Sequence, residues 1–331
     1  MSLHSQSGVQ ASGKAVHAPA AGSTLARVGA LAVLVALLAV PFLLYPVFLM
    51  KVLCFALFAC AFNLLIGFGG LLSFGHAAFF GSAAYVTAHT VKVWGLSPEL
   101  GILLGTAASA FLGILFGSIA IRRQGIYFAM ITLALSQMVF FLALQLPFTH
   151  GEDGIQAVPR GVLFEVFDLN NPLAMYYTVL GVFLIGFAII WRTVHSPFGQ
   201  VLKAIRENEP RAISLGYRTE RYKLMAFVLS ATLAGLAGGT KAIVFQLATL
   251  TDVTWQMSGE VVLMTLLGGM GTLTGPVIGA ALVVTLENYL AATSLPVPVV
   301  IGCIFVVCVL VFRRGIAGEI QARFGKQSRS G

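Results

Sequence analysis

The chain has 331 residues, of which 58% are hydrophobic and only 10% are charged, and its formal net charge is +8. A soluble domain carries roughly 25% charged residues, so this composition excludes an ordinary soluble domain and indicates a polytopic membrane protein. The positive charge does not indicate nucleic-acid binding, because the basic residues lie in loops and tails beside apolar segments, where they set membrane orientation and contact anionic membrane lipid.

The predicted elements follow from the apolar segments in chain order. Residues 1–24, rich in Ser, Ala and Gly, are predicted to form a disordered tail. Because about 20 residues cross the hydrocarbon layer, transmembrane helices are expected near 25–45, 47–68, 71–91, 98–120, 125–147, 173–191, 224–246 and 296–312. The region 258–291 is interrupted by the glycine-rich residues 268–276 and forms either two short crossings or one helix plus a re-entrant segment.

This pattern predicts an all-α polytopic membrane protein with about 8–10 transmembrane helices, of which ten is the preferred count. The transmembrane domain is predicted to span 25–315, and a basic tail follows at 316–331. The segment 195–223 and this tail are basic, whereas the loop 148–172 is acidic. The positive-inside rule therefore places 195–223 and both termini in the cytoplasm and 148–172 outside.

Two glycine-rich segments at membrane depth are candidates for lining a translocation path. Glycine weakens a helix, and irregular backbone at that depth is tolerated only where it is buried in protein or lines a cavity. The alternative for the first segment is a tightly packed helix hairpin. His76 could carry a proton or bind a metal, but no second His or carboxylate lies at ligand spacing, which favours an orienting hydrogen bond. The candidate residues are Gly67, Gly70, Ser73, Gly75, His76, Gly81, Gly268, Gly269, Gly271 and Thr272.

Two carboxylates and several glycine pairs also stand out in the apolar regions. Glu260 and Glu287 must face other helices or water, and either could be a proton relay; Glu260 follows the loop containing Asp252 and could instead lie at the outer interface. Glycines four residues apart predict close helix packing at Gly101 and Gly105, Gly113 and Gly117, and Gly275 and Gly279. The sequence contains no phosphate-binding loop, HExxH helix or CxxC pair, so we assign no catalytic, cofactor-binding or metal-binding residue.

The segment 195–223 is the most polar part of the chain, with six Lys/Arg and three Asp/Glu residues. Its burial in lipid would cost on the order of 25 kcal/mol, so it lies in water. Phe198, Val201, Leu202 and Ile205 nevertheless fall on one face at helical spacing. This spacing predicts an amphipathic helix whose apolar face needs a partner.

Five strings occur in order: GFGGLLSFGHAAFFGSAAY, RRQGIYFAMITLALSQM, GEDGIQAVPRG, SPFGQVLKAIRENEPRAISLGYRTERYKLMAFVLSATLAGLAGG and LLGGMGTLTGPVIGA. Together they resemble the membrane permeases of branched-chain amino-acid ABC importers of the LivM type. The resemblance runs from about Asn63 to Ala280 and through the final predicted helix. It implies a permease subunit, not an enzyme, in the bacterial inner membrane that translocates branched-chain or related hydrophobic amino acids.

The resemblance also implies partners and a coupling role. The partners are a second homologous permease subunit, two ATPase subunits that hold ATP and magnesium, and an extracytoplasmic solute-binding protein; no cofactor is expected on this chain. The coupling helix of the family fits a cleft on the ATPase and maps onto 198–216, with Val201, Leu202 and Ile205 as the expected anchors. Its expected residues are Phe198, Val201, Leu202, Ile205, Arg206, Glu207, Glu209 and Gly216.

The coupling loop departs from the pattern of general importers, in which Glu-Ala-Ala is followed by Gly. Pro210 follows Glu209 here and fits the first turn of a short second helix, which Asn208 or Glu209 caps and Gly216 ends. The docking element is therefore expected to be bent.

Two alternatives remain open at this point. Within the same class, the chain could serve an importer of urea, short amides or aromatic acids. From a different class, a secondary transporter driven by protons or sodium would need a paired charge network inside the membrane, and Glu260, Glu287 and His76 provide only a thin one.

Overall fold

The computed structural model describes residues 35–42, 44–163, 167–291, 299–300, 302–303, 306, 310 and 315–319. The chain divides into two compact units, Met1–Leu43 and Leu44–Gly331. In the first unit, the described residues end in a 3-10 turn, η1 (Val40–Phe42). The predicted tail at 1–24 lies outside the described residues, as do 25–34 and much of the predicted helix at 296–312.

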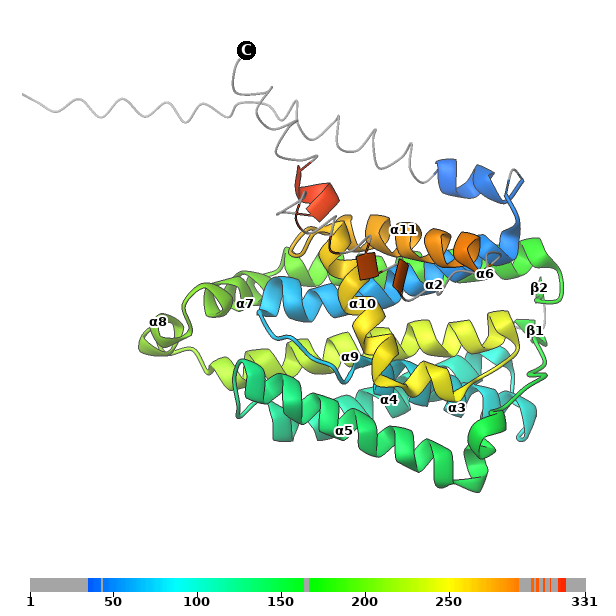
Figure 1. Cartoon of the computed structure of the whole chain (residues 1–331), viewed down its shortest axis with the longest axis horizontal. Helices are drawn as coiled ribbons and strands as arrows, with labels where there is room; N and C mark the ends of the chain where they lie inside the picture. Colours follow the sequence, from blue (N-terminus) through cyan, green and yellow to red (C-terminus); the bar gives the residue numbers. More distant parts are fainter. Residues whose placement is uncertain are drawn as a thin grey trace, which may run out of the picture. The chain divides into compact units, whose positions relative to one another are not determined.

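Helices dominate the described part of the second unit (Figure 1). Six of them carry proline in the first turn, where a missing backbone N–H costs nothing. The elements are α2 (Pro46–Asn63), η2 (Leu64–Phe68), α3 (His76–Lys92), α4 (Pro98–Ala120), α5 (Ile126–Gln145), η3 (Pro147–Thr149), η4 (Gly151–Asp153), β1 (Val162–Leu163), β2 (Phe167–Asp168), α6 (Pro172–Val194), α7 (Pro197–Glu207), α8 (Glu209–Ser214), α9 (Thr219–Phe245), η5 (Leu250–Val253), α10 (Trp255–Gly268) and α11 (Gly275–Leu290). The two short strands pair antiparallel within the loop that precedes α6.

Five of the described helices are long and apolar enough to cross a membrane, and they coincide with five predicted spans. They are Pro46–Phe68, Pro98–Ala120, Ile126–Gln145, Pro172–Val194 and Thr219–Phe245. The all-α membrane class is therefore confirmed. The region 258–291 forms two short helices, α10 with 14 residues and α11 with 16, and α11 packs against both α10 and α2.

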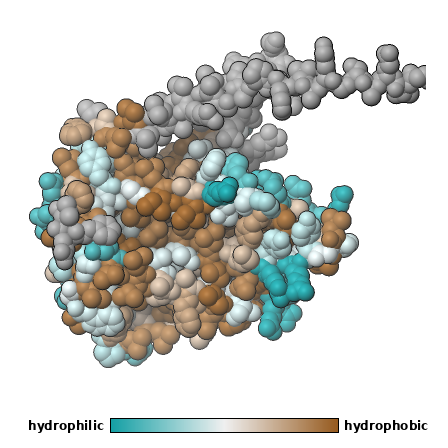
Figure 2. All heavy atoms as spheres, turned by 180° about the vertical axis from the view of Figure 1, so that it is seen from behind, coloured by the Kyte–Doolittle hydropathy of each residue, from teal (hydrophilic) through white to brown (hydrophobic). Residues whose placement is uncertain are grey.

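Helices α2 and α9 form the centre of the second unit, because most of their side chains are buried. Helix α9 packs against α2, α3 and α4, while α4, α5 and α6 leave many large apolar side chains exposed. Figure 2 shows hydrophobic residues over much of the visible face, with hydrophilic residues gathered mainly toward one end. Exposed apolar surface of this kind suits contact with lipid or with another membrane subunit.

Glycines allow the closest helix contacts, as the four-residue spacings predict. A Cβ atom on Gly105 would lie 2.6 Å from the Ala83 carbonyl oxygen of α3, and one on Gly113 would lie 2.7 Å from the Ala231 Cβ of α9. A Cβ atom on Gly279 would overlap the Met264 carbonyl oxygen of α10. The backbones approach this closely only because these positions lack side chains.

The predicted span at 71–91 begins later than expected, because α3 starts only at His76. Residues 70–75 are not helical, and Gly70 has a φ of +71°, which glycine adopts without strain. The backbone N–H of Phe74 donates to the Thr132 hydroxyl at 3.1 Å, and that of Gly75 donates to the Ser73 hydroxyl at 3.1 Å. Side chains thus satisfy backbone groups that a continuous helix would have paired internally.

Candidate functional site

The two glycine-rich segments meet at the end of α2, where one buried side chain joins them. The Asn63 amide nitrogen donates to the Thr272 carbonyl oxygen at 2.8 Å, and its amide oxygen accepts from the Gly271 N–H at 3.0 Å. Asn63 is only 2% exposed. We call the loop 269–274 between α10 and α11 the break loop, and this contact fixes it to the end of α2.

The π-helical turn η2 leaves a backbone acceptor free at the same place. The N–H groups of Gly70 and Leu71 bond to the carbonyls of Ile66 and Leu65. The next carbonyl, that of Gly67, belongs to the end of the helix, where intrahelical donors run out. It accepts a hydrogen bond from Nη1 of Arg206, which lies on α7. The cytoplasmic loop predicted from the sequence therefore contacts the first glycine-rich segment directly.

Helix α7 packs along this turn with its apolar face. Leu202 and Ile205 are 1% and 3% exposed, and the Leu202 methyl groups lie beside Gly69. The Lys203 ammonium lies 5.5 Å from the centre of the Phe68 ring. A cavity of about 380 Å³ opens where α7, η2 and the break loop come together, lined by Phe68, Lys203, Arg206, Glu207 and Gly271.

The structure corrects the expected role of Leu202 and Ile205. Both side chains are covered by the chain's own helices, so they attach α7 to the membrane domain and cannot insert into a groove on a partner. Val201 and Phe198 are half-buried in the same layer. A stretch of amphipathic sequence shows that one face of a helix is buried, but it does not show against which partner.

Sequence reasoning missed the exposed apolar residues at the far end of this loop. Ile213, Leu215 and Tyr217 are 56%, 70% and 41% exposed. They lie at and just beyond the end of α8, which projects away from the other labelled helices (Figure 1). The signal was available in the printed sequence, since these apolar residues interrupt a polar stretch outside the spacing of Phe198 to Ile205.

The bend predicted between two short helices is confirmed. Asn208 caps α8 by accepting from the Arg211 N–H at 3.1 Å, and Pro210 lies in the first turn. Gly216 ends the element with a φ of +87°. The N–H of Gly216 bonds to Ile213, and the next N–H bonds to the Ala212 carbonyl, which is the Schellman pattern of a glycine-terminated helix.

Both short helices are also fixed to α9. Lys223 of α9 forms an ion pair of 2.5 Å with Glu209 of α8, and the two side chains are 5% and 17% exposed. Phe198 of α7 stacks on Tyr222 of α9 with ring centres 5.6 Å apart. Glu207 and Arg206 remain exposed overall. The loop is therefore a braced projection of the membrane domain.

The remaining glycine-rich candidates lie in the helical core, away from the break loop. Ser73 and His76 are fully buried, and His76 Nε2 is 2.8 Å from the Ser230 hydroxyl of α9, so the predicted orienting hydrogen bond is confirmed. A Cβ atom on Gly75 would lie 3.2 Å from the Thr132 carbonyl oxygen, and one on Gly81 would lie 2.8 Å from that of Asp252. These residues support helix packing in the described chain, and their place on a translocation path remains a prediction.

The predicted residues in the break loop are more exposed than those in the first glycine-rich segment. Gly268 and Gly269 are buried, whereas Gly271 and Thr272 are partly exposed, and Gly271 lines the cavity beside Arg206. The structure therefore brings Gly67, Gly70, Gly271 and Thr272 to one junction.

Charged residues form a second group where α2, α10 and α11 adjoin. Lys51 of α2 and Glu287 of α11 are 3.3 Å apart and are 31% and 18% exposed. Glu260 of α10 is partly buried and within electrostatic range of both, with no hydrogen-bonding partner among the described residues. The structure therefore places both glutamates in one mixed-charge cluster, and a role as proton relays remains a prediction.

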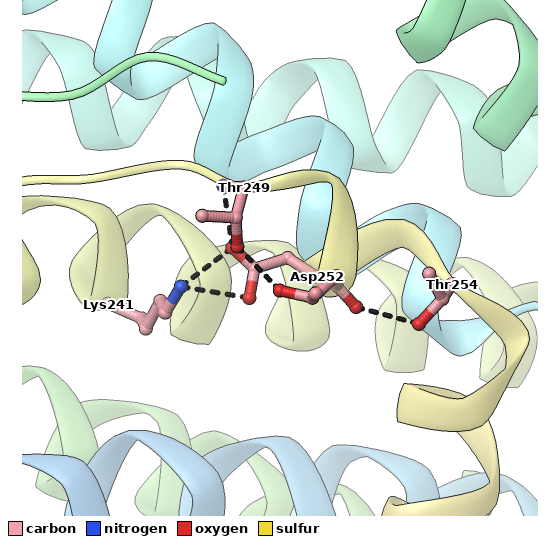
Figure 3. A network of polar contacts seen from close by, with 5 residues as sticks. Lys241, Thr249, Asp252 and Thr254 are labelled. Carbon is pink, nitrogen blue, oxygen red and sulfur yellow. Dashed lines mark hydrogen bonds and ion pairs between the residues drawn. The ribbon is translucent and has the colours of Figure 1, made fainter. Parts of the chain in front are cut away.

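A buried ion pair went unrecognised in the sequence. Lys241 of α9 contacts both carboxylate oxygens of Asp252 in η5, at 2.8 and 2.6 Å (Figure 3). Asp252 also accepts from the N–H and the hydroxyl of Thr249, at 3.1 Å each. A single lysine in an apolar run needs a partner, so the lone Lys241 was itself the available signal.

Comparisons with known proteins agree with this architecture. Residues 45–312 match a family model described as branched-chain amino acid transport system / permease component. The high-affinity branched-chain amino acid transport system permease protein LivM of Escherichia coli is 28% identical over 178 residues, which cover 47% of this chain and 42% of that protein. No solved structure matches the chain.

Two other relatives carry different names. The autoinducer 2 import system permease protein LsrC of Salmonella choleraesuis is 29% identical over 50% of this chain and 48% of its own length. The ribose import permease protein RbsC of Bacillus subtilis is 28% identical over 54% and 58%. The chain thus spans about half the length of the curated relatives it matches. With a family match over most of the chain and several helices able to cross a membrane, the chain belongs to the branched-chain amino acid transport system permease family of multi-pass membrane proteins.

Proposed function

We propose that the chain is one permease subunit of an ATP-driven importer and that α7 and α8 form its contact with the ATPase. The supporting observation is the braced projection that these two short helices form. Its inner face is buried on the glycine-rich junction, and its outer end exposes Ile213, Leu215 and Tyr217. An exposed apolar tip on a polar segment is suited to insertion into a hydrophobic groove of a partner.

The proposed cargo is a branched-chain or related hydrophobic amino acid. The family description and the LivM relative support this choice, whereas the other relatives are named for autoinducer 2 and ribose. A hydroxyl-rich ligand needs many free hydrogen-bonding groups, but three polar side chains of this region are already engaged. The Ser73 hydroxyl accepts from Gly75, the Thr272 hydroxyl donates to Gly269, and Asn63 holds the break loop. Mostly small and apolar walls suit an apolar side chain better.

The proposed assembly contains a second homologous permease, two ATPase subunits that hold ATP and magnesium, and an extracytoplasmic solute-binding protein. The basic loop and both termini would face the cytoplasm, because cytoplasmic loops of membrane proteins are enriched in Lys and Arg. In this arrangement the tip of α8 lies on the same side of the membrane as ATP.

The test is reconstitution of the chain with the ATPase, permease and binding-protein subunits encoded beside it. We expect ATP-dependent uptake of radiolabelled leucine into vesicles, and ribose uptake instead of leucine uptake would overturn the proposed cargo. Leu215→Asp places a charge on the apolar tip and should reduce ATPase co-purification at least tenfold. Ser214→Asp is the matched control, since it adds the same charge at the neighbouring exposed position and should retain the ATPases. Full ATPase retention by Leu215→Asp would refute the docking surface.

A further inference from the structure

We propose that Arg206 is a positioning residue that transmits movement of α7 to the two glycine-rich segments. This inference rests on the proposed function, because it assumes that a partner ATPase moves α7 and α8. It adds a specific route, from the Arg206 guanidinium through the Gly67 carbonyl and the Asn63 amide to the break loop at 269–274.

The first step of the route is the contact of Arg206 with η2. Its Nη1 atom donates to the Gly67 carbonyl oxygen. Its aliphatic stem occupies the space beside Gly70, where a Cβ atom would lie 2.9 Å from the Arg206 Cγ. The positive φ of Gly70 and its missing side chain together allow this approach. Arg206 can therefore pack this close to η2 only because residue 70 is a glycine.

The second step joins the end of α2 to the break loop. Arg206 Nη1 also lies 3.4 Å from the place where a Gly271 side chain would begin. Asn63, four residues before Gly67, bonds to both Gly271 and Thr272. A displacement of the Gly67 carbonyl therefore moves η2. Asn63, which directly precedes η2, would pass this movement to the break loop through its two hydrogen bonds.

Other contacts of α7 are less suited to this role. Leu202 and Ile205 make apolar contacts, which are non-directional, and Lys203 only lies over the Phe68 ring. A charge-assisted hydrogen bond from a planar guanidinium is both stronger and directional. The nearby carboxylate of Glu209 pairs with Lys223. Arg206 forms no ion pair within the described part of the chain, so its guanidinium is available to bond to the Gly67 carbonyl.

The break loop is the element that can change shape. Gly269 and Gly271 have φ values of +117° and +75°, and Met270 and Thr274 are exposed. Hinges are commonly a few residues at the ends of elements that absorb backbone rotation. The loop connects the end of α10 to the start of α11, so a change in its backbone would alter the orientation of these two helices relative to each other.

The test uses a reporter thiol in the break loop of the assembled transporter. Thr274→Cys is introduced into a chain whose native cysteines are replaced by alanine, and its rate of labelling by a thiol reagent is measured with and without ATP and vanadate. We expect the labelling rate to change at least threefold on ATP binding when Arg206 is present. Arg206→Ala should bring this ratio close to one. The ATPases should still co-purify and hydrolyse ATP, because the Arg206 guanidinium bonds to the Gly67 carbonyl, whereas the proposed docking tip is formed by Ile213, Leu215 and Tyr217.

Two further variants separate a relay from a general loss of charge or structure. Arg206→Lys keeps a donor of similar reach but only as a point charge, so it should restore part of the response. Arg192→Ala removes an exposed arginine at the end of α6, outside the proposed ATPase contact, whose side chain forms no hydrogen bond or ion pair among the described residues, and it should retain the full response.

The outcomes distinguish this inference from the proposed function. A full ATP response in Arg206→Ala, or an absent response in the parent reporter with ATPases bound, would overturn the relay and leave the importer assignment intact. Loss of the ATPases from Arg206→Ala would also overturn it, because Arg206 would then be a docking residue. Failure of the ATPases to co-purify with the parent chain would instead overturn the proposed function.

Discussion

The buried ion pair between Lys241 and Asp252 allows a quantitative prediction about stability. The two side chains are 10% and 3% exposed, and both carboxylate oxygens contact the ammonium group. Removing one member of a buried pair leaves an uncompensated charge and costs about 3–5 kcal/mol. The two single variants should nevertheless differ, because the two charges have different remaining partners.

Asp252→Leu should be the more damaging variant. It strands the lysine, whose other nearby group is the Phe245 ring at 5.9 Å, and it also removes the capping box that Asp252 forms with Thr249. Loss of the cap adds about 1 kcal/mol, so we expect a total of about 4–6 kcal/mol. Lys241→Met leaves the carboxylate with two hydrogen bonds from Thr249 and should cost about 3 kcal/mol.

The double variant Lys241→Met with Asp252→Leu should lie close to the parent, within about 1–2 kcal/mol, because apolar side chains replace both charges. The assay is denaturant unfolding in mixed micelles, followed by tryptophan fluorescence. The more exposed pair of Lys51 and Glu287, 3.3 Å apart, is the comparison. Lys51→Met should cost less than Lys241→Met, because Glu287 is 18% exposed whereas Asp252 is 3% exposed. Additive effects in the double variant, with no coupling between the positions, would refute the reasoning.

Two further predictions concern packing and orientation. A Cβ atom on Gly238 would overlap the Phe80 carbonyl oxygen, so Gly238→Ala should destabilise the chain by about 1–3 kcal/mol. Gly181→Ala is the control, because the space at its Cβ position is open, and it should leave the free energy of unfolding unchanged in the same denaturant assay. In intact cells, a cysteine-free chain with Asp153→Cys should be labelled by an impermeant reagent and one with Asn208→Cys should not; the opposite pattern would reverse the proposed orientation.

Much of the helical framework could be predicted from the sequence. The span predicted at 98–120 coincides with α4, which begins at Pro98 after an extended Ser97 and then runs through apolar and small residues. The bend at Asn208 and the end at Gly216 were also predictable, because a proline fits the first turn and a glycine accepts a positive φ. These features depend on local chemistry, which a single sequence contains.

Features that depend on distant partners could not be predicted in the same way. The late start of α3 relies on Thr132, which lies on α5 and supplies the acceptor for Phe74. The amphipathic face of α7 was recognised, but its burial against Gly69 instead of a partner depends on tertiary packing. The Lys241 pair required a turn, η5, that folds back to α9.

The contacts of α7 and α8 determine which parts of the membrane domain would move if an ATPase displaced the tip of α8 in the proposed importer. Glu209 is held by Lys223 and Phe198 by Tyr222, so both short helices move with the start of α9. Helix α9 in turn packs against α2, α3 and α4 along its length, which makes it part of the rigid centre. Movement carried by α9 alone would shift the central helices together and would leave their mutual arrangement unchanged. A change within the membrane domain therefore requires a contact that acts on an irregular segment, and among the described residues of α7 Arg206 makes the directional one, at the Gly67 carbonyl.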